Sequence, residues 1–201
     1  GGRFSYTGQT GNLNYVFAME SEPRYRNNDT FEASRDAAGN LLEVREENII
    51  RDQDDLQASM NLGYQFENSI VQFNALFGQT SPPTSVRRTI TDFRGSEVSV
   101  ENVREGNQFD RDNWEVVGDF EYDFSAGSTY RVLFLVNDAE SDFTRERFDV
   151  LDTGDDKNLF LRSLGRERER IVRTSYTWNV AAEQAVELGV EGAQTIRNNG
   201  L

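Results

Sequence analysis

The segment from Asp112 to Asp138, DNWEVVGDFEYDFSAGSTYRVLFLVND, decides the predicted fold. In its first half, apolar side chains stand at even positions from Trp114 to Phe124, and acidic side chains stand at odd positions. Successive side chains of a β-strand point to opposite faces, so this alternation gives one apolar and one acidic face. The second half alternates in the same way around Phe134, and residues 125–128 contain a glycine between the two runs. This pattern predicts a β-hairpin.

The same alternation predicts further strands along the chain. The runs have 7–13 residues, and the longer ones exceed the usual soluble strand and suit a strand that crosses a membrane. The predicted strands cover residues 3–9, 13–20, 56–67, 71–78, 112–124, 130–137, 169–180 and 184–196. They form four hairpins, with short turns near Gly11, Asn68, Gly127 and Ala182.

Long polar segments separate these hairpins. They cover residues 21–55, 79–111 and 139–168, and we expect them to be loops. Residues 36–40 are expected to form a hairpin tip within the first loop. Pro82-Pro83 is expected to break a strand in the second. Short turns at one end and long loops at the other are typical of an outer-membrane β-barrel.

Composition narrows the possible functions. Among 201 residues the net charge is −14, so the basic surface that binds nucleic acid is missing. The chain has no cysteine and no histidine, which excludes disulfides, thiolate metal sites and catalytic pairs that depend on Cys or His. We therefore expect no enzyme and no cofactor. No apolar run reaches the length of a membrane-spanning helix, and no signal peptide opens the chain.

Aromatic residues gather on the apolar parity near the predicted short turns. In membrane proteins such rings concentrate at the boundary between lipid and water. We therefore predict a girdle of aromatic residues on the turn side, which in bacterial barrels is periplasmic. Its members are Tyr6, Tyr15, Tyr64, Phe66, Phe73, Tyr122, Phe124, Tyr130, Tyr176 and Trp178.

Charged residues occupy the opposite parity and are expected to line a water-filled lumen. They are Glu115, Asp119, Glu121, Asp123, Arg131, Arg173, Glu187 and Glu191. The carboxylates among them could instead form a cation path, a docking surface or a catalytic pair, because carboxylates two apart on a strand share a face. An ordinary polar lumen lining is the simpler interpretation.

The strands and turns resemble those of TonB-dependent outer-membrane receptors. The segments that carry the resemblance are GYQFENSIVQF, FEYDFSAGSTYRV and YTWNVAAEQAVELGVEG. The resemblance implies an all-β, antiparallel, up-and-down transmembrane barrel of the 22-stranded type, in the outer membrane of a Gram-negative bacterium. It also implies energy-coupled uptake of a siderophore, vitamin or carbohydrate, with lipopolysaccharide, a plug domain and the TonB complex as partners.

Residues 1–201 then form about eight consecutive strands of the barrel domain, without plug domain or coupling box. Both ends of the chain would lie on the outer side, so we expect a piece of a larger barrel. A slice of a porin-like barrel is an alternative. A soluble extracellular β-sheet module for binding or adhesion is another, because such a sheet also has one apolar and one polar face.

Three further groups carry site hypotheses. Arg166, Arg168 and Arg170 share the parity of the apolar face and could bind lipopolysaccharide phosphates. The alternative is a solvated ladder with Glu167 and Glu169. The other two groups are Asp152, Asp155 and Asp156, as a calcium loop without EF-hand spacing, and Arg87, Arg88 and Arg94, as a contact for an anionic ligand.

Overall fold

The computed structural model describes residues 1–124, 127–181 and 184–201. Its described residues form ten β-strands. They are β1 (Gly2–Thr10), β2 (Leu13–Ser21), β3 (Arg24–Arg35), β4 (Leu41–Gln65), β5 (Ser69–Ser81), β6 (Thr84–Asp92), β7 (Ser99–Phe124), β8 (Ser128–Leu151), β9 (Gly154–Ala181) and β10 (Gln184–Gly200). Among these residues no helix is long and apolar enough to span a membrane.

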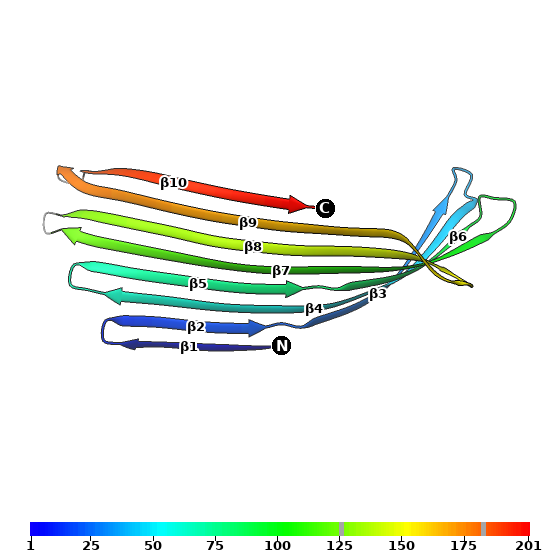
Figure 1. The fold of residues 1–201 in the computed structure, drawn as a ribbon, viewed down its shortest axis with the longest axis horizontal. Helices are drawn as coiled ribbons and strands as arrows, with labels where there is room; N and C mark the ends of the chain where they lie inside the picture. The colour runs from blue at the N-terminus through cyan, green and yellow to red at the C-terminus, as the bar shows by residue number, and fades with distance from the viewer. Residues whose placement is uncertain (125–126, 182–183) are drawn as a thin grey trace.

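All ten strands belong to one antiparallel sheet (Figure 1). Eight of them follow one another in the order β1-β2-β4-β5-β7-β8-β9-β10. The remaining two, β3 and β6, pair with the ends of β4 and β7 that lie away from the short turns. The prediction of an all-β, antiparallel, up-and-down arrangement is confirmed for the sheet. In the described residues β1 pairs only with β2 and β10 only with β9, so the sheet is open.

Prolines separate β2 from β3 and β5 from β6. Pro23 lies between β2 and β3, and Pro82-Pro83 lies between β5 and β6. β2 pairs with residues 56–64 of β4, and β3 pairs with residues 41–53 of the same strand. Proline lacks the N–H that a ladder needs, so the strand is interrupted there and then resumes.

The sheet therefore has two regions, which we name the wall and the extension. The wall contains the short turns and consists of β1, β2, β5, β10 and residues 54–65, 112–124, 128–138 and 169–181. The extension consists of β3, β6 and residues 41–53, 99–111, 139–151 and 154–168. Figure 1 shows the wall as a broad curved sheet and the extension as its twisted far end.

The prediction that residues 21–55, 79–111 and 139–168 are loops was wrong. Most of them continue the wall strands, so that β4, β7, β8 and β9 have 25, 26, 24 and 28 residues. The strands were hidden because both of their faces carry polar side chains, which removes the alternation. The structure has ten strands where the sequence predicted eight.

The short turns are close to the predicted positions. Gly11 and Gly127 adopt positive φ angles of 58° and 73°, which glycine reaches without steric cost. The predicted hairpin tip at residues 36–40 is also present, where the backbone N–H of Gly39 donates to the carbonyl oxygen of Asp36. The predicted turn residues 125–126 and 182–183 lie outside the described part of the chain.

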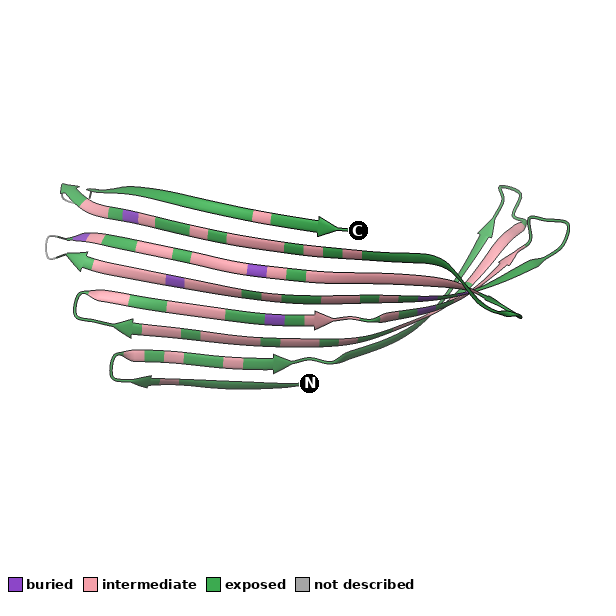
Figure 2. Ribbon diagram, viewed as in Figure 1, coloured by how far each residue is buried: buried purple, intermediate pink, exposed green. Residues whose placement is uncertain are grey.

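The sheet is a single layer. Among the described residues, contacts between strands occur only between sheet neighbours. Figure 2 shows few buried positions, and the two buried apolar residues, Val86 and Val103, both lie in the extension. The wall thus has no buried apolar core, although it carries many large apolar side chains.

Candidate functional site

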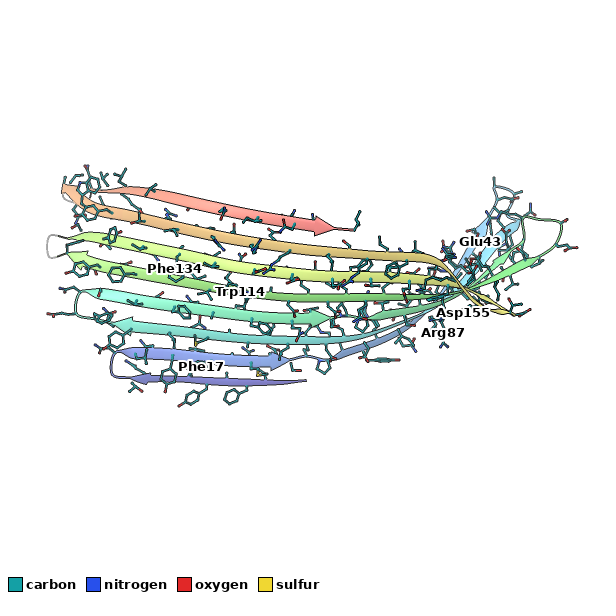
Figure 3. The ribbon with its side chains drawn as sticks, viewed as in Figure 1. Phe17, Glu43, Arg87, Trp114, Phe134 and Asp155 are labelled. Carbon is teal, nitrogen blue, oxygen red and sulfur yellow. The ribbon has the colours of Figure 1, made fainter. Side chains whose placement is uncertain are left out.

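One face of the wall is almost continuously apolar. Residues paired across neighbouring strands share a face, so the register assigns each side chain. Phe17 pairs with Tyr6 and Met60, and this row continues through Ala75 to Val116. We name this side the apolar face. Figure 3 labels three of its residues, Phe17, Trp114 and Phe134.

The apolar residues of this face form a band across the strands. The edge of the band nearest the extension runs obliquely to the strands. Its last apolar residues in β4, β5, β7, β8, β9 and β10 are Leu56, Phe77, Trp114, Val136, Val172 and Val190. The pairs at the edge are Leu56 with Gln79, Phe77 with Trp114, Trp114 with Asp138, Val136 with Arg170 and Val172 with Gly192. Four of these five pairs join an apolar residue to a polar residue or to glycine, so the edge drops by two residues at each of these four steps.

This drop measures the tilt of the strands relative to the band. In β1 and β2 the last apolar residues, Phe4 and Met19, lie in the row of Phe77, two residues short of Leu56. From β1 to β10 the net drop is therefore six residues, about 20 Å along a strand, over seven strand spacings, about 34 Å. The strands thus lie about 30° from the normal of the band. Strands of transmembrane barrels are tilted by about 35–45°.

The short turns show the same stagger. The last pairs of the four hairpins are Thr10–Leu13, Gln65–Ile70, Phe124–Ser128 and Ala181–Gln184. Through the intervening register, successive hairpins reach one, three and three residues further than the one before. About seven residues over six strand spacings give a tilt of about 40°. The two edges of the band thus slope in the same direction.

The band has the thickness of a membrane core. On β7 it runs from Trp114 to Phe124, about 33 Å along the strand. On β4 it runs from Leu56 to Tyr64, about 26 Å, and Phe66 lies just beyond the end of that strand. At a tilt of about 40° the run on β7 crosses a layer of about 25 Å, which is the height of the apolar band of outer-membrane barrels.

The ten predicted girdle residues all belong to the apolar face. Their most regular part is the cross-strand row Tyr122–Tyr130–Tyr176 on β7, β8 and β9. Phe124 lies 6.0 Å from Tyr176 between ring centroids, and Trp178 stacks on Tyr176 at 5.7 Å. Tyr6, Tyr15 and Phe73 lie further from the turns, nearer the middle of the band.

The sequence analysis missed a second aromatic group, at the opposite edge of the band. Phe77 pairs with Trp114, and Phe4 lies in the same cross-strand row. The polar residues that follow two positions away, such as Asp112 on β7, would have marked this edge in the sequence. Outer-membrane barrels have aromatic girdles at both interfaces.

Aromatic rings cover two glycines of the apolar face. A side chain on Gly118 would place its Cβ 2.1 Å from a ring atom of Phe134, which is its cross-strand partner. A Cβ on Gly8 would lie 2.4 Å from the hydroxyl oxygen of its partner Tyr15. Each ring fills the space that glycine leaves, and this contact fixes the register of the pair.

The predicted lumen residues share the opposite side of the wall, which we name the polar face. Asp119, Arg173 and Glu191 belong to one cross-strand row, and the Asp119 carboxylate accepts a 2.8 Å hydrogen bond from Arg131. The other predicted residues, Glu115, Glu121, Asp123 and Glu187, lie in neighbouring rows. This face is not uniformly polar, because Val117, Leu135 and Ile171 form an aliphatic row within it.

Ion pairs between strands characterise the extension. They include Arg104–Asp155 at 2.7 Å, Arg145–Glu105 at 2.9 Å, Lys157–Glu146 at 2.6 Å, Arg162–Asp142 at 2.7 Å, and Arg88–Glu47. Opposite charges on neighbouring strands contribute to the stability of a sheet. These pairs explain why the polar segments form strands.

Glu105 is the most buried carboxylate of this network, with 6% of its surface exposed. Burial alone would raise its pKa. Hydrogen bonds from Arg145 and Asn107, together with the charges of Arg145 and Arg88, outweigh burial and hold the pKa of Glu105 below its ordinary value. Similarly, the hydrogen bond from Arg162 lowers the pKa of Asp142.

The predicted arginine group of β9 lies on the apolar face, next to the edge of the band. Arg166 donates two hydrogen bonds to Asp138, at 3.0 and 2.6 Å. Arg168 and Arg170 have no acidic partner among the described residues. Glu167 and Glu169 point to the other face, so the three arginines do not form a ladder with them.

The predicted calcium loop does not assemble. Asp155 is held by Arg104, whereas Asp156 pairs with Asp149 on the other face of the sheet. Among the described residues, no group of three or more His, Cys, Asp or Glu side chains could hold a metal ion.

Comparison with known proteins does not assign a family. No family model matches the chain, and no curated protein matches it. One solved structure, described as a crystal structure of lipopolysaccharide binding protein, is 7% identical with a TM-score of 0.17. The match covers 98% of this chain and 77% of that one. A TM-score this low establishes no common fold, and no argument rests on it.

Proposed function

We propose that the wall is a segment of a transmembrane β-barrel in a bacterial outer membrane. The observation that carries the proposal is the oblique apolar band. Its two edges slope in the same direction, its slant is close to the strand tilt of such barrels, and its thickness on β7 matches their apolar height. In a barrel the apolar face contacts lipid, and the polar face lines the lumen.

We further propose that the barrel belongs to a receptor of the TonB-dependent type, which takes up a scarce ligand such as a siderophore, vitamin or carbohydrate. The short turns on one side and the long extended connections on the other support this assignment. A plug domain would lie against the polar face, where the aliphatic row of Val117, Leu135 and Ile171 offers it an apolar contact. Coupling to the TonB complex would act through that plug.

The exposed apolar side chains disfavour the soluble alternative. Leu188 and Val190 on β10 are 70% and 68% exposed, and Phe4 on β1 is 64% exposed. A soluble domain buries such residues against a second layer, but the sheet has one layer among its described residues. Lipid is a cover that needs no second layer of protein.

Cysteine labelling tests the proposed orientation, because the chain has no cysteine of its own. Val116 and Val117 are neighbours on β7 with side chains on opposite faces. In chains reconstituted in lipid vesicles, we expect a water-soluble maleimide to label Val117→Cys at least about tenfold faster than Val116→Cys. Lipid excludes the reagent from the apolar face. Equal labelling of both variants would contradict the barrel.

The flanking gene sequence tests the receptor assignment separately. We expect a plug-like domain before Gly1 and further alternating strands after Leu201. A secretion signal alone before Gly1, with a stop codon soon after Leu201, would contradict the receptor and favour a soluble module.

A further inference from the structure

A hollow of about 760 Å³ lies in the extension, away from the polar face of the wall. It spans β3, β4, β6, β7 and the tip between β8 and β9. Two cross-strand rows of side chains flank it, and both continue the apolar face of the wall. One row is Asp29–Asn48–Arg87–Arg104, and the other is Phe31–Glu46–Thr89–Asn102 with Val150 and Asp155.

Two arginines face each other at the centre of the first row. Arg87 on β6 and Arg104 on β7 are direct register partners. Like charges directly opposite on paired strands destabilise a sheet. Other like-charged register partners also occur in the extension, such as Arg26–Arg51, so the opposition alone does not mark a site. What distinguishes Arg87 is its place in the lining of the hollow and the absence of an acidic partner among the described residues.

The neighbouring charges leave Arg87 available for a ligand. Arg104 is held by Asp155, and its guanidinium also lies 4.2 Å from the ring centroid of Phe148. Arg88 pairs with Glu47, and Arg94 pairs with Glu43 and Asp92. Arg87 is exposed and has no acidic partner among the described residues. Figure 3 shows Arg87 and Asp155 close to where the strands cross at the far end of the sheet.

The rest of the hollow offers groups that bind sugars. Thr89 bonds to Asn102 at 2.9 Å, and Asn48 donates to Asp29 at 2.8 Å. These amides and hydroxyls can exchange hydrogen bonds with a polyhydroxylated ligand. Phe31 is 68% exposed and provides an apolar platform on which the C–H face of a sugar ring can pack.

We propose that this hollow binds a saccharide that carries a carboxylate or phosphate group. The anionic group lies between Arg87 and Arg104 and removes their repulsion, because a guanidinium fork matches both anions. The sugar hydroxyls bond to Asn48, Thr89 and Asn102, and one ring packs on Phe31. The volume accommodates two to three sugar residues, since ligand pockets of this size hold drug-sized molecules.

The position of the hollow separates it from the transport path. Arg104 lies ten residues beyond Trp114 on β7, on the same face as the apolar band. If the wall crosses the outer membrane as proposed, this face of the extension looks away from the lumen. The saccharide can then come from the headgroup of a neighbouring lipid or from free glycans at the cell surface. Only this placement rests on the proposed function.

Calorimetric titration of the folded chain in detergent tests the site. The probes are trigalacturonic acid and its methyl ester, which has the same rings without the charge. We expect the acid to bind about tenfold or more tighter than the ester, because the ester forms no charge-assisted bonds with the arginines. Arg87→Gln should remove this difference. Arg26→Gln, a change at an exposed arginine on β3 that does not line the hollow, should leave it intact.

Equal binding of acid and ester, no binding of either, or unchanged binding by Arg87→Gln would overturn the proposal. Competition by lipopolysaccharide but not by lipid A would identify the lipid-linked source, whereas competition by neither would identify free glycans. Both outcomes support the site. The cysteine labelling of Val116 and Val117 reports on the barrel independently, so either proposal can fail while the other stands.

Discussion

The wall and the extension share the same strands but not the same side chains. In the wall, one face is apolar and the other polar, and Arg131–Asp119 is its closest ion pair. In the extension, charged side chains stand on both faces and ion pairs join the strands. The ladders that join β7 to β8 and β8 to β9 run through both regions. Backbone hydrogen bonds therefore hold the sheet together in both regions. The side chains differ between the regions and indicate what each face contacts.

The edge of the apolar band, which lies close to the boundary between the two regions, is sharp. On β7 it falls between Trp114 and Asp112, and on β8 between Val136 and Asp138. Two residues on one face, about 6.6 Å along a strand, thus separate large apolar from charged side chains. A membrane interface imposes this kind of boundary, because the cost of a charge rises steeply toward the hydrocarbon.

A charge in the middle of the apolar face should have the largest effect. Leu62→Arg places a guanidinium at mid-band, where lipid cannot solvate it. We expect a loss of about 2–4 kcal/mol in the free energy of unfolding, measured by urea titration in lipid vesicles. The matched change in the extension, Ser85→Arg, should alter stability by less than about 0.5 kcal/mol. Equal losses would remove the distinction between the two regions.

Closing the space above Gly118 should have a smaller effect within the wall. Gly118→Ala forces the ring of Phe134 to move, because the new Cβ would lie 2.1 Å from it. We expect a loss of about 1–3 kcal/mol in the same titration. Gly63→Ala, on the polar face with open space above it, should cost much less. If Phe134→Leu does not reduce the cost of Gly118→Ala, the ring contact is not its cause.

Acid should loosen the extension more than the wall. The pKa of Glu105 is lower in the folded chain, so its contribution to stability is present at neutral pH. That contribution is lost as the pH falls below the unfolded value of about 4.3 and through the folded pKa. We expect the protection factor of the Val103 amide, which corrects for the slower intrinsic exchange in acid, to fall between pH 5 and pH 3, while protection in the wall changes little.

Arg145→Gln provides the control for this pH dependence. It removes one of the bonds that hold the carboxylate of Glu105 and should cost about 1–3 kcal/mol at pH 7. The acid sensitivity of exchange at Val103 should then shrink. An unchanged pH profile in this variant would show that Glu105 does not link the extension to pH.

The wall could be predicted because a strand with one apolar and one polar face alternates along its sequence. Alternation around Trp114 and Phe134 gave both strands of the central hairpin and the face of each side chain. The oblique course of the band could not be predicted, because it depends on register between strands. The pairing of Trp114 with Asp138, rather than with another apolar residue, appears only when the strands are aligned.

The extension escaped prediction because charged strands carry no apolar period. Glu46, Glu47 and Asn48 were predicted to lie in a loop. In the structure they belong to β4, which pairs with β6 at Arg88, and β6 pairs in turn with β7 near Asn102. Glu47 and its partner Arg88 are 41 residues apart in the sequence, so no local pattern reveals this pair. The arginines 87, 88 and 94 were identified from sequence, but only the structure distinguishes Arg87 from its two neutralised neighbours.

Depth-dependent fluorescence quenching tests the central claim most directly, since the chain contains only two tryptophans. Trp114 lies at one edge of the apolar band, and Trp178 lies near the other. In vesicles whose lipids carry bromine at defined depths, we expect both residues to be quenched by lipid. Shallow labels should quench them most strongly, and acrylamide in the water should quench them weakly. Variants Trp114→Phe and Trp178→Phe separate the two signals. If neither tryptophan is quenched by brominated lipid, the apolar face does not contact a membrane and the account is wrong.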